Sequence, residues 1–264
     1  MTDATILYEK KGLIATVTLN RPHRGNAYAR TTSDELKAAW KQAGEDKDVR
    51  VVVFTAAGDR YFCTGNVDFK ELSEAGGHTK TTGAYRPFGG GMGPYSNGLW
   101  KPVICAVNGL CAGGGYALVA ESDFAIASEN AAFADTHVSW GQAANYDALG
   151  MRNAGVPLGW VFRLALMGIH ERIDAKKALE LGMVTEVVPH GQLLPRAYEL
   201  AEKVAQNSPA ALRASKQIIW HAVEVSYTEG LRYGWEVLSK NWSHPDTLEG
   251  PTAFSQKRKP RWTD

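Results

Sequence analysis

The chain has 264 residues, of which 44% are hydrophobic, enough for one large domain or for a core with a helical appendage. Its formal net charge of +1 argues against nucleic acid or an anionic membrane as a partner. No apolar run approaches the ~20 residues of a membrane span, and the polar N-terminus has no signal-peptide core. Three cysteines without metal-ligand spacing indicate reduced thiols, no metal site and a cytoplasmic protein.

Strands and helices alternate through the first half of the chain. Hydrophobic periodicity predicts, in order, a hairpin (6–9 and 13–19), a helix (30–44), a buried strand (51–55), a short helix (68–74), a strand (103–107), a helix (116–120) and a strand (124–127). Thr32 and Glu35 have the spacing of a capping box at the start of the first helix. The glycine-rich segment 75–98 has no periodic apolar pattern, so it is either a functional loop or a surface insertion.

Helices dominate the last third of the chain. The pattern predicts helices at 155–166 and 173–181, a strand at 184–188, and then three helices at 193–206, 210–225 and 228–242. Strands therefore alternate with helices to about residue 190 and helices follow alone. We accordingly divide the chain into a core of residues 1–192 and a helical region of residues 193–264.

The stretch 101–115, KPVICAVNGLCAGGG, carries the clearest chemical signal. A short apolar strand leads through a turn at Asn108-Gly109 to three consecutive glycines, Gly113 to Gly115, before a helical run. Glycines let a backbone approach a ligand closely, and the first amides of a helix have no partner within that helix. Such a turn suits an anion, or a carbonyl oxygen that becomes negative during reaction. Close helix-to-strand packing is the alternative explanation.

Several segments resemble, in order and spacing, the crotonase superfamily of enoyl-CoA hydratases and isomerases. They are LNRPHRGNAY (19–28), VRVVVFTAAGDRYFCTGNVDFKEL (49–72), KPVICAVNGLCAGGGYALVAESDFAIASENAAFA (101–134), ALELGMVTEVVP (178–189), SPAALRASKQ (208–217) and EGPTAFSQKRKPRW (249–262). The resemblance implies an α/β fold: a spiral of ββα units with a C-terminal helical region that forms homotrimers or dimers of trimers. It also implies an acyl-CoA substrate, with coenzyme A as part of that substrate and no other cofactor.

The resemblance also assigns binding roles to particular residues. The backbone amides of Asn66 and Gly114 would hold the thioester carbonyl oxygen as an oxyanion hole. Coenzyme A would contact Arg24 and the turn of Cys63, Gly65 and Asn66, and the tail residues Phe254 and Lys257 would reach it, often from a neighbouring subunit. A solvated surface cation is the alternative for Arg24.

The chain departs from the family at the positions of the two hydratase glutamates. By the motif spacing these positions are Ala117 and His137, so a histidine stands where the second glutamate is expected. His137 can act as acid or base near neutral pH, and Asp147 would orient it. A structural histidine, and a helix N-cap at Asp147, are the alternatives. Tyr146 or a displaced acid at Glu121 would be further helpers, and Trp140 is expected to line the acyl pocket or the core.

These observations predict an enzyme of the enoyl-CoA hydratase/isomerase type, a lyase that stabilises a thioester enolate. The same oxyanion hole would also serve a hydrolase that cleaves a thioester or a β-dicarbonyl carbon–carbon bond with a His/Asp pair. A third interpretation is a relative that binds acyl-CoA, or RNA, without catalysis, although the near-neutral charge argues against RNA. The sequence does not identify the acyl group.

Overall fold

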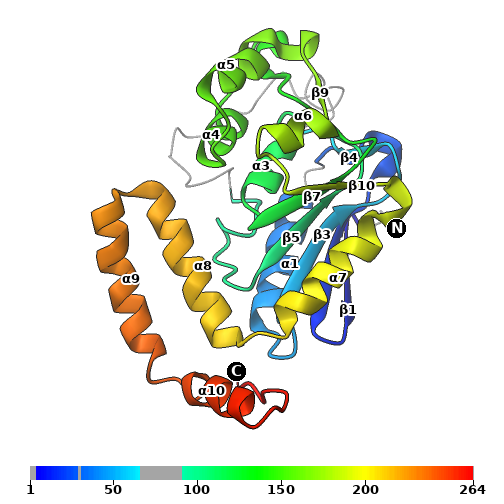
Figure 1. Ribbon diagram of the computed structural model, residues 1–264. Coiled ribbons are helices and arrows are strands. Elements are labelled where there is room, and N and C mark those ends of the chain that lie inside the picture. The colour runs from blue at the N-terminus through cyan, green and yellow to red at the C-terminus, as the bar shows by residue number, and fades with distance from the viewer. Residues whose placement is uncertain (1–3, 29–30, 66–90, 264) are drawn as a thin grey trace.

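The computed structural model describes residues 4–28, 31–65 and 91–263, and Figure 1 shows their arrangement. The larger of two sheets has six strands in the order β1-β2-β3-β5-β7-β10. The strands are β1 (Ile6–Lys11), β2 (Ile14–Leu19), β3 (Val51–Ala56), β5 (Val103–Val107), β7 (Phe124–Ser128) and β10 (Glu186–Val188). The hairpin of β1 and β2 is antiparallel, and every other pairing in this sheet is parallel.

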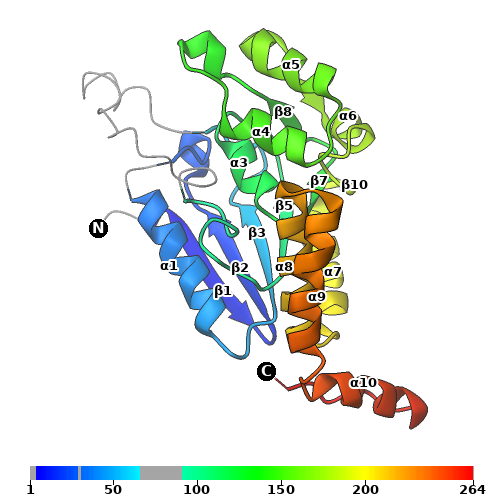
Figure 2. The same ribbon diagram turned by 90° about the vertical axis from the view of Figure 1, so that its left-hand side faces the viewer.

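Helices cover both faces of the large sheet (Figures 1 and 2). Every residue of β3 and β5 is buried, as expected for parallel strands covered on both sides. On one face α1 (Thr32–Glu45) buries Leu36 and Trp40 against Phe54. On the other, α7 (Leu193–Ala205) presents Leu193 and three alanines to the strands. The helices on both faces fix the ends of the large-sheet strands from which the smaller sheet continues.

The smaller sheet is built from short strands that follow the strands of the large one. It has the order β4-β6-β8-β9, with β4 (Tyr61–Cys63), β6 (Leu110–Ala112), β8 (Ala132–Ala134) and β9 (Ile173–Asp174). Because β3 leads to β4, β5 to β6 and β7 to β8, the chain repeats one supersecondary unit and turns as a spiral. Helices α3 (Gly115–Ala120), α4 (Tyr146–Asn153), α5 (Leu158–Met167) and α6 (Ala175–Glu180) pack around this sheet, with 3-10 helices at Pro22–Arg24, His137–Trp140, Gly168–His170 and His190–Gln192.

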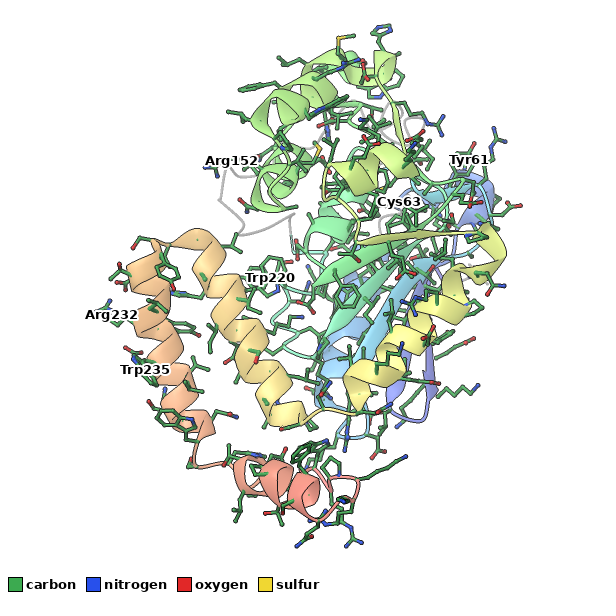
Figure 3. The ribbon with its side chains drawn as sticks, in the orientation of Figure 1. Tyr61, Cys63, Arg152, Trp220, Arg232 and Trp235 are labelled. Atoms are coloured by element: carbon green, nitrogen blue, oxygen red, sulfur yellow. The ribbon has the colours of Figure 1, made fainter. Side chains whose placement is uncertain are left out.

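The last helices extend from the body as an arm, which we define as α8 (Pro209–Glu224), α9 (Tyr227–Asn241) and α10 (Asp246–Ser255). One face of α8 is anchored to the core by Lys216 and Trp220. The Lys216 ammonium lies 2.9 Å from an oxygen of Asp123, whose other oxygen accepts from the Trp220 indole at 2.8 Å. In Figure 3 Trp220 faces the core, whereas Arg232 and Trp235 lie on the outer side of α9.

The predicted fold is confirmed, and the structure corrects some of its details. The strands and helices expected from periodicity lie within a few residues of their predicted positions, but segment 173–181 begins as β9, and the short strands β4, β6 and β8 and helices α4 and α10 were not expected. The capping box is wrong: Glu35 Oε2 instead accepts from Thr5 N (2.7 Å) and Ile6 N (3.0 Å), because the start of β1 brings backbone donors beside it.

Other predictions about the fold meet no test. The helix at 68–74 and most of the loop at 75–98 lie outside the described residues. The division of the chain at residue 192 stays a prediction, although α7, just beyond it, packs on the sheet. Among the described residues we find no helix long and apolar enough to cross a membrane.

Candidate active site

A cavity of about 450 Å³ opens where the short strands β4, β6 and β8 end. The segments that follow these parallel strands meet at one edge of the small sheet, as strand ends of the same direction must. Three groups of residues line the cavity. The segment after β2 contributes Arg21, His23, Arg24 and Ala27, and the segment after β8 contributes Thr136, His137, Trp140 and Gln142. Strand β6 and the turns after β4 and β6 contribute Thr64, Gly65, Leu110, Ala112, Gly113 and Gly114.

The two glycine turns touch each other on one wall. A side-chain carbon added to Gly65 would lie 3.1 Å from the Gly114 nitrogen and 3.0 Å from the Ala112 carbonyl oxygen. Gly65 also has a φ of +96°, which few other residues adopt. The position therefore requires glycine, and the close approach brings the amide of Gly114 beside the first turn.

Tyr28 holds both turns in place. Its backbone N–H donates to the Gly65 carbonyl (3.1 Å), and its hydroxyl donates to the Gly114 carbonyl (2.7 Å). The side chain is buried, and burial raises the pKa of this phenol well above its usual value, so it remains a neutral donor. These two hydrogen bonds fix the positions of Gly65 and Gly114 on the cavity wall.

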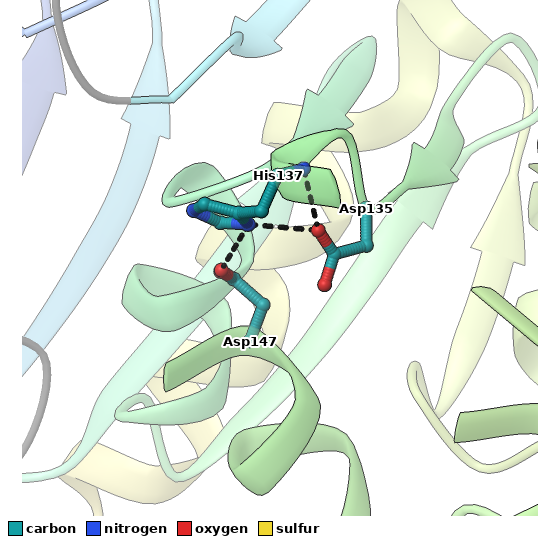
Figure 4. Close-up of side chains that lie close together, drawn as sticks. All are labelled: Asp135, His137 and Asp147. Atoms are coloured by element: carbon teal, nitrogen blue, oxygen red, sulfur yellow. Dashed lines mark hydrogen bonds and ion pairs between the residues drawn. The ribbon is translucent and has the colours of Figure 1, made fainter. Parts of the chain in front are cut away.

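His137 lies beside the second glycine turn, because a side-chain carbon added to Gly113 would lie 3.7 Å from the ring carbon Cε1. One of its ring nitrogens is held by two aspartates (Figure 4). Its Nδ1 is 2.7 Å from Asp135 Oδ1 and 3.4 Å from Asp147 Oδ2. The aspartate side chains are 1% and 2% exposed, whereas the histidine side chain is 19% exposed. Asp135 follows β8 directly, and Asp147 lies on α4. Oδ1 of Asp147 accepts from the backbone N–H of Ala117 at 3.2 Å. The remaining ring nitrogen, Nε2, lies on the side of the ring away from both carboxylates.

These contacts change the acidity of the imidazole and of Asp147. The hydrogen bond to Asp135 raises the pKa of His137, with burial acting the other way and the charge of Asp147 adding to the rise. Burial raises the pKa of Asp147 to about 6, while the imidazole opposes that shift and the charge of Asp135 adds to it. The shift brings the Asp147 carboxyl closer to neutral pH, and the raised pKa of His137 favours its charged form, as acid–base catalysis at a buried site requires.

The same three side chains are the candidates for a bound cation among the described residues. One ligand atom from each of Asp135, His137 and Asp147 lies within 4.8 Å of the others. Two carboxylates and one imidazole form a donor set that suits several divalent metals. The Nδ1 contact to Asp135 is, however, of ordinary hydrogen-bond length. A proton on Nδ1 accounts for it, and the prediction of no metal stays a prediction.

Comparison with known proteins identifies the architecture around this cavity. A model of the family described as enoyl-CoA hydratase/isomerase matches residues 9–264. The chain belongs to this family. It is 32% identical to (E)-benzylidenesuccinyl-CoA hydratase of Thauera aromatica over 97% of each chain. It is also 33% identical to carnitinyl-CoA dehydratase of Proteus mirabilis, over 96% of this chain and 95% of the relative.

Solved structures give the same result for the fold. The crystal structure of an enoyl-CoA hydratase/isomerase from Mycobacterium paratuberculosis superposes with a TM-score of 0.88 at 37% identity, covering 100% of this chain and 99% of that one. An enoyl-CoA hydratase from Mycobacterium tuberculosis gives 0.86 at 31% identity, with 98% of each chain covered. The resemblance to the crotonase superfamily read from the motifs is therefore confirmed.

The structure brings four of the nine predicted site residues of this family member to the cavity. Gly65, Gly114, His137 and Arg24 line it, and Trp140 does so as well. Asp147 reaches His137 from behind. Cys63 is fully buried beneath the first turn, where burial raises the pKa of its thiol to about 12. Asn66 lies outside the described residues.

The predicted coenzyme A contacts of the tail lie far from the cavity of the same chain. Phe254 is on α10 and Lys257 follows that helix, and both are exposed at the end of the arm (Figures 1 and 2). Their role therefore depends on a neighbouring copy, as the resemblance implied, and stays a prediction.

Sequence reasoning missed two residues of the site. Asp135 was overlooked although it lies only two positions before His137, the spacing at which an aspartate accepts a backbone N–H. Tyr28 was overlooked because its position, after Asn26-Ala27, looks like a core position. A polar-tipped aromatic residue there is the signal, since a buried hydroxyl needs a partner.

The structure also places the alternative helpers. Asp147 is the second residue of α4, Asn145 is the cap position, and no side chain caps the helix, so the N-cap interpretation of Asp147 is wrong. Glu121, at the end of α3, accepts from the Ser96 backbone N–H at 2.9 Å, and burial raises its pKa. Tyr146 is partly exposed at the start of α4.

Proposed function

We propose that this chain catalyses the reversible addition of water to an enoyl-CoA thioester, with His137 as the acid–base group. The observation that carries the proposal is the geometry of His137, whose Nδ1 is held by buried carboxylates while the residue lines the same cavity as Gly114. A ring held in this way presents Nε2 to whatever occupies the cavity. Family membership and relatives named as hydratases and dehydratases support the reaction class.

In the hydration direction Nε2 takes a proton from water while the water oxygen bonds to the β-carbon. The electron pair of the carbon–carbon double bond moves toward the thioester, and the carbonyl oxygen becomes an enolate oxygen. The amide of Gly114 faces that oxygen, and the amide of Asn66 is the second donor that the family resemblance implies. A donor of this kind contributes on the order of 3 kcal/mol to the transition state. The α-carbon then takes the proton back from Nε2. Double-bond isomerisation, which moves a proton between the α- and γ-carbons, would use the same acid–base group and the same oxyanion hole.

The cavity also supports an acyl-CoA as the substrate. Arg21, His23 and Arg24 gather on one of its walls, and cationic side chains are the natural partners of phosphate and pyrophosphate groups. The relatives named above carry CoA thioesters in their names. We further propose that copies of the chain associate through the arm as homotrimers or dimers of trimers, and that the protein works in the cytoplasm.

Hydrolysis of a thioester, or of a β-dicarbonyl carbon–carbon bond, is the second candidate. Ala117 and His137 stand where the resemblance expects two glutamates, and a histidine backed by aspartates is suited to activating water toward a carbonyl. The oxyanion hole would serve this reaction unchanged. The two candidates differ in the carbon that receives the oxygen atom.

The deciding experiment follows heavy oxygen from labelled water by mass spectrometry. Wild type and His137→Ala are incubated with a panel of saturated, unsaturated and β-keto acyl-CoAs. We expect the label on a β-hydroxyacyl-CoA, with turnover reduced by a factor of ~10²–10⁴ in His137→Ala, as for loss of a general acid–base group. His190→Ala, which removes an exposed histidine outside the cavity, is the matched control and should retain full activity.

Other outcomes select other functions. Label in a released carboxylic acid supports the hydrolase. Equal turnover in wild type and His137→Ala removes the histidine from the mechanism. Tight acyl-CoA binding by the wild type, without turnover of any panel member, supports a protein that binds acyl-CoA without transforming it.

A further inference from the structure

The two aspartates beside His137 make different contacts. Asp135 Oδ1 accepts both from the backbone N–H of His137 (3.1 Å) and from its ring Nδ1 (2.7 Å). Asp147 approaches the same Nδ1 at 3.4 Å with Oδ2, which has no hydrogen-bond partner among the described residues, and its Oδ1 accepts from Ala117 N. Asp135 is thus tied to the histidine through two donors, whereas Asp147 is tied to another helix and only faces the ring.

We propose that the two carboxylates divide the work: Asp135 is a positioning residue that keeps a hydrogen on Nδ1, and Asp147 shares one further proton with His137. The cluster then holds that proton either on Nε2 of the imidazole or on the Asp147 carboxyl. Because Nε2 lies away from both carboxylates, the two states exchange the proton with water and not by direct transfer through the ring. This division of roles between Asp135 and Asp147 is inferred from the geometry of the cluster. Only the use of the shared proton in catalysis rests on the proposed function.

Charge balance supports a shared proton. If both buried aspartates were ionised beside a neutral imidazole, two negative charges would lie around one nitrogen at short range, which is costly at low dielectric. One more proton, on the ring or on Asp147, brings the cluster to a net charge of −1 in either place. Groups that interact this strongly titrate as a unit, in steps that belong to the pair.

Within the part of the chain that the structure describes, the surroundings leave His137 as the group with which Asp147 shares the proton. The charges that act on Asp147 are those of His137 and Asp135. The charge of Asp147 in turn acts on four other buried titratable groups, Tyr28, Cys63, Cys111 and Tyr116. Burial raises the pKa of each, so these phenols and thiols are neutral near pH 7. Arg21, His23 and Arg24 line the same cavity as His137, whereas Asp147 is closed off beneath it.

A shared proton suits a reversible hydration. With the proton on Nε2, the imidazolium donates to a departing hydroxyl in the dehydration direction. With the proton on Asp147, Nε2 is unprotonated and accepts from water in the hydration direction. The fixed hydrogen on Nδ1 ensures that Nε2, and not Nδ1, exchanges protons in both cases.

Nitrogen NMR of ring-labelled histidine tests this division without any substrate. In the wild type we expect Nδ1 to stay protonated between pH 5 and 8, and Nε2 to titrate in two coupled steps. Asp147→Asn should leave Nδ1 protonated and give a single step shifted to lower pH. Asp135→Ala should move the ring toward the tautomer with hydrogen on Nε2, and Asp135→Asn, which keeps an acceptor oxygen, should restore the wild-type tautomer.

Three results would overturn the proposal. One is loss of the Nδ1 hydrogen in Asp147→Asn but not in Asp135→Ala, which would exchange the two roles. Another is an unchanged titration in Asp147→Asn, which would show that no proton is shared. The third is a titration that appears only after chelation and vanishes with added zinc, which would make the cluster a metal site.

Kinetics with an enoyl-CoA separate this inference from the proposed function. Asp135→Ala should lower kcat by a factor of ~10²–10⁴, up to the loss caused by replacing the aspartate that orients a triad histidine, with a KM within threefold of wild type and partial rescue by Asp135→Asn. Asp147→Asn should shift the kcat/KM pH profile toward acid. If the NMR results are as expected but no enoyl-CoA is turned over, the division of roles between the two aspartates stands and the proposed hydration is wrong. If an enoyl-CoA is turned over but the titration of His137 is unaltered in Asp147→Asn, the hydration stands and the division of roles is wrong. Circular dichroism and CoA binding establish that each variant is folded.

Discussion

At the scale of single residues, the most consequential observation is a carboxyl group that is buried with little to compensate its charge. Among the described residues, the Asp147 carboxylate is stabilised by the backbone N–H groups of Ala117 and of Asp147 itself, and it lies 3.4 Å from His137 Nδ1. Burial therefore raises its pKa from 3.8 to about 6. The folded protein binds a proton at this position more tightly than the unfolded chain does, and stability must depend on pH accordingly.

We expect Asp147→Asn to become increasingly stabilising, relative to wild type, as pH rises from about 4 to 7. A group whose pKa is higher in the folded than in the unfolded protein stabilises the fold at pH values below its unfolded-state pKa. That stabilisation is lost as pH rises through its folded-state pKa, so ionisation of Asp147 costs the wild type stability only above about pH 4. A shift of this size corresponds to roughly 3 kcal/mol at most, and the imidazole that shares the proton reduces it. Urea unfolding of both proteins at pH 4, 5, 6 and 7 measures the difference.

The control is Asp34→Asn, an exposed aspartate in the first turn of α1. Because it removes an exposed carboxylate near a helix N-terminus, it should not become more stable than wild type as pH rises. An offset between Asp147→Asn and wild type that does not grow with pH would show that the Asp147 carboxyl has no raised pKa in the folded protein.

At the scale of elements, the start of α3 is decided by contact with a neighbouring strand. Gly115 is its first residue, and a side-chain carbon there would lie 2.5 Å from the Cys63 carbonyl oxygen of β4. The helix can therefore reach the strand only with glycine at this position. That contact aligns the two glycine turns on the cavity wall. The packing of α3 against β4 therefore also determines the position of the Gly114 amide at the site.

Gly115→Ala is expected to destabilise the fold by ~1–3 kcal/mol, the usual range for overpacking, and to lower activity by moving Gly114. The matched control is Gly159→Ala in α5, where an added carbon meets nothing within 4 Å. That substitution should stabilise the protein by ~0.5–1 kcal/mol through helix propensity. Thermal unfolding and turnover of both variants check the pair, and equal effects of the two substitutions would contradict a specific contact at Gly115.

At the scale of the whole molecule, the arm exposes large apolar side chains to solvent. On α9, Leu231 is 54% and Trp235 is 59% exposed, and Trp242 packs edge-on against Trp235 at 5.4 Å between ring centres. Trp235 lies on the outer side of α9, away from α8 (Figure 3). Exposed apolar surface of this extent is typical of a protein–protein contact, which supports association of copies through the arm.

Light scattering after size exclusion should give three or six times the mass of one chain for the wild type. Leu231→Asp combined with Trp235→Asp should reduce that mass, because a charge in an apolar contact must be desolvated without a partner. Leu13→Asp, at an exposed apolar residue of the hairpin turn, is the control and should leave the assembly unchanged. A wild type that elutes with the mass of one chain would rule out the proposed assembly.

Periodicity predicted the elements whose pattern is long enough to repeat. The buried strand Val51–Ala56 and helices such as Pro209–Glu224 were placed within two residues. The short strands β4, β6 and β8 were not, because three residues contain no repeat. The motif at Gly113 to Gly115 was predicted to form a ligand site, and the structure places it at the cavity, whereas the residue limits of the short strand before it could not be predicted.

The sequence by itself determined the family, the spiral fold, the glycine wall and the histidine, because these depend on motifs whose residues are adjacent along the chain. Only the tertiary structure decided which groups surround that histidine. Asp135 comes from the end of β8 and Asp147 from α4, and their distances to Nδ1 depend on how that helix packs against α3. Protonation depends on burial and on charges within a few ångströms, and both are properties of the folded chain rather than of its residue order.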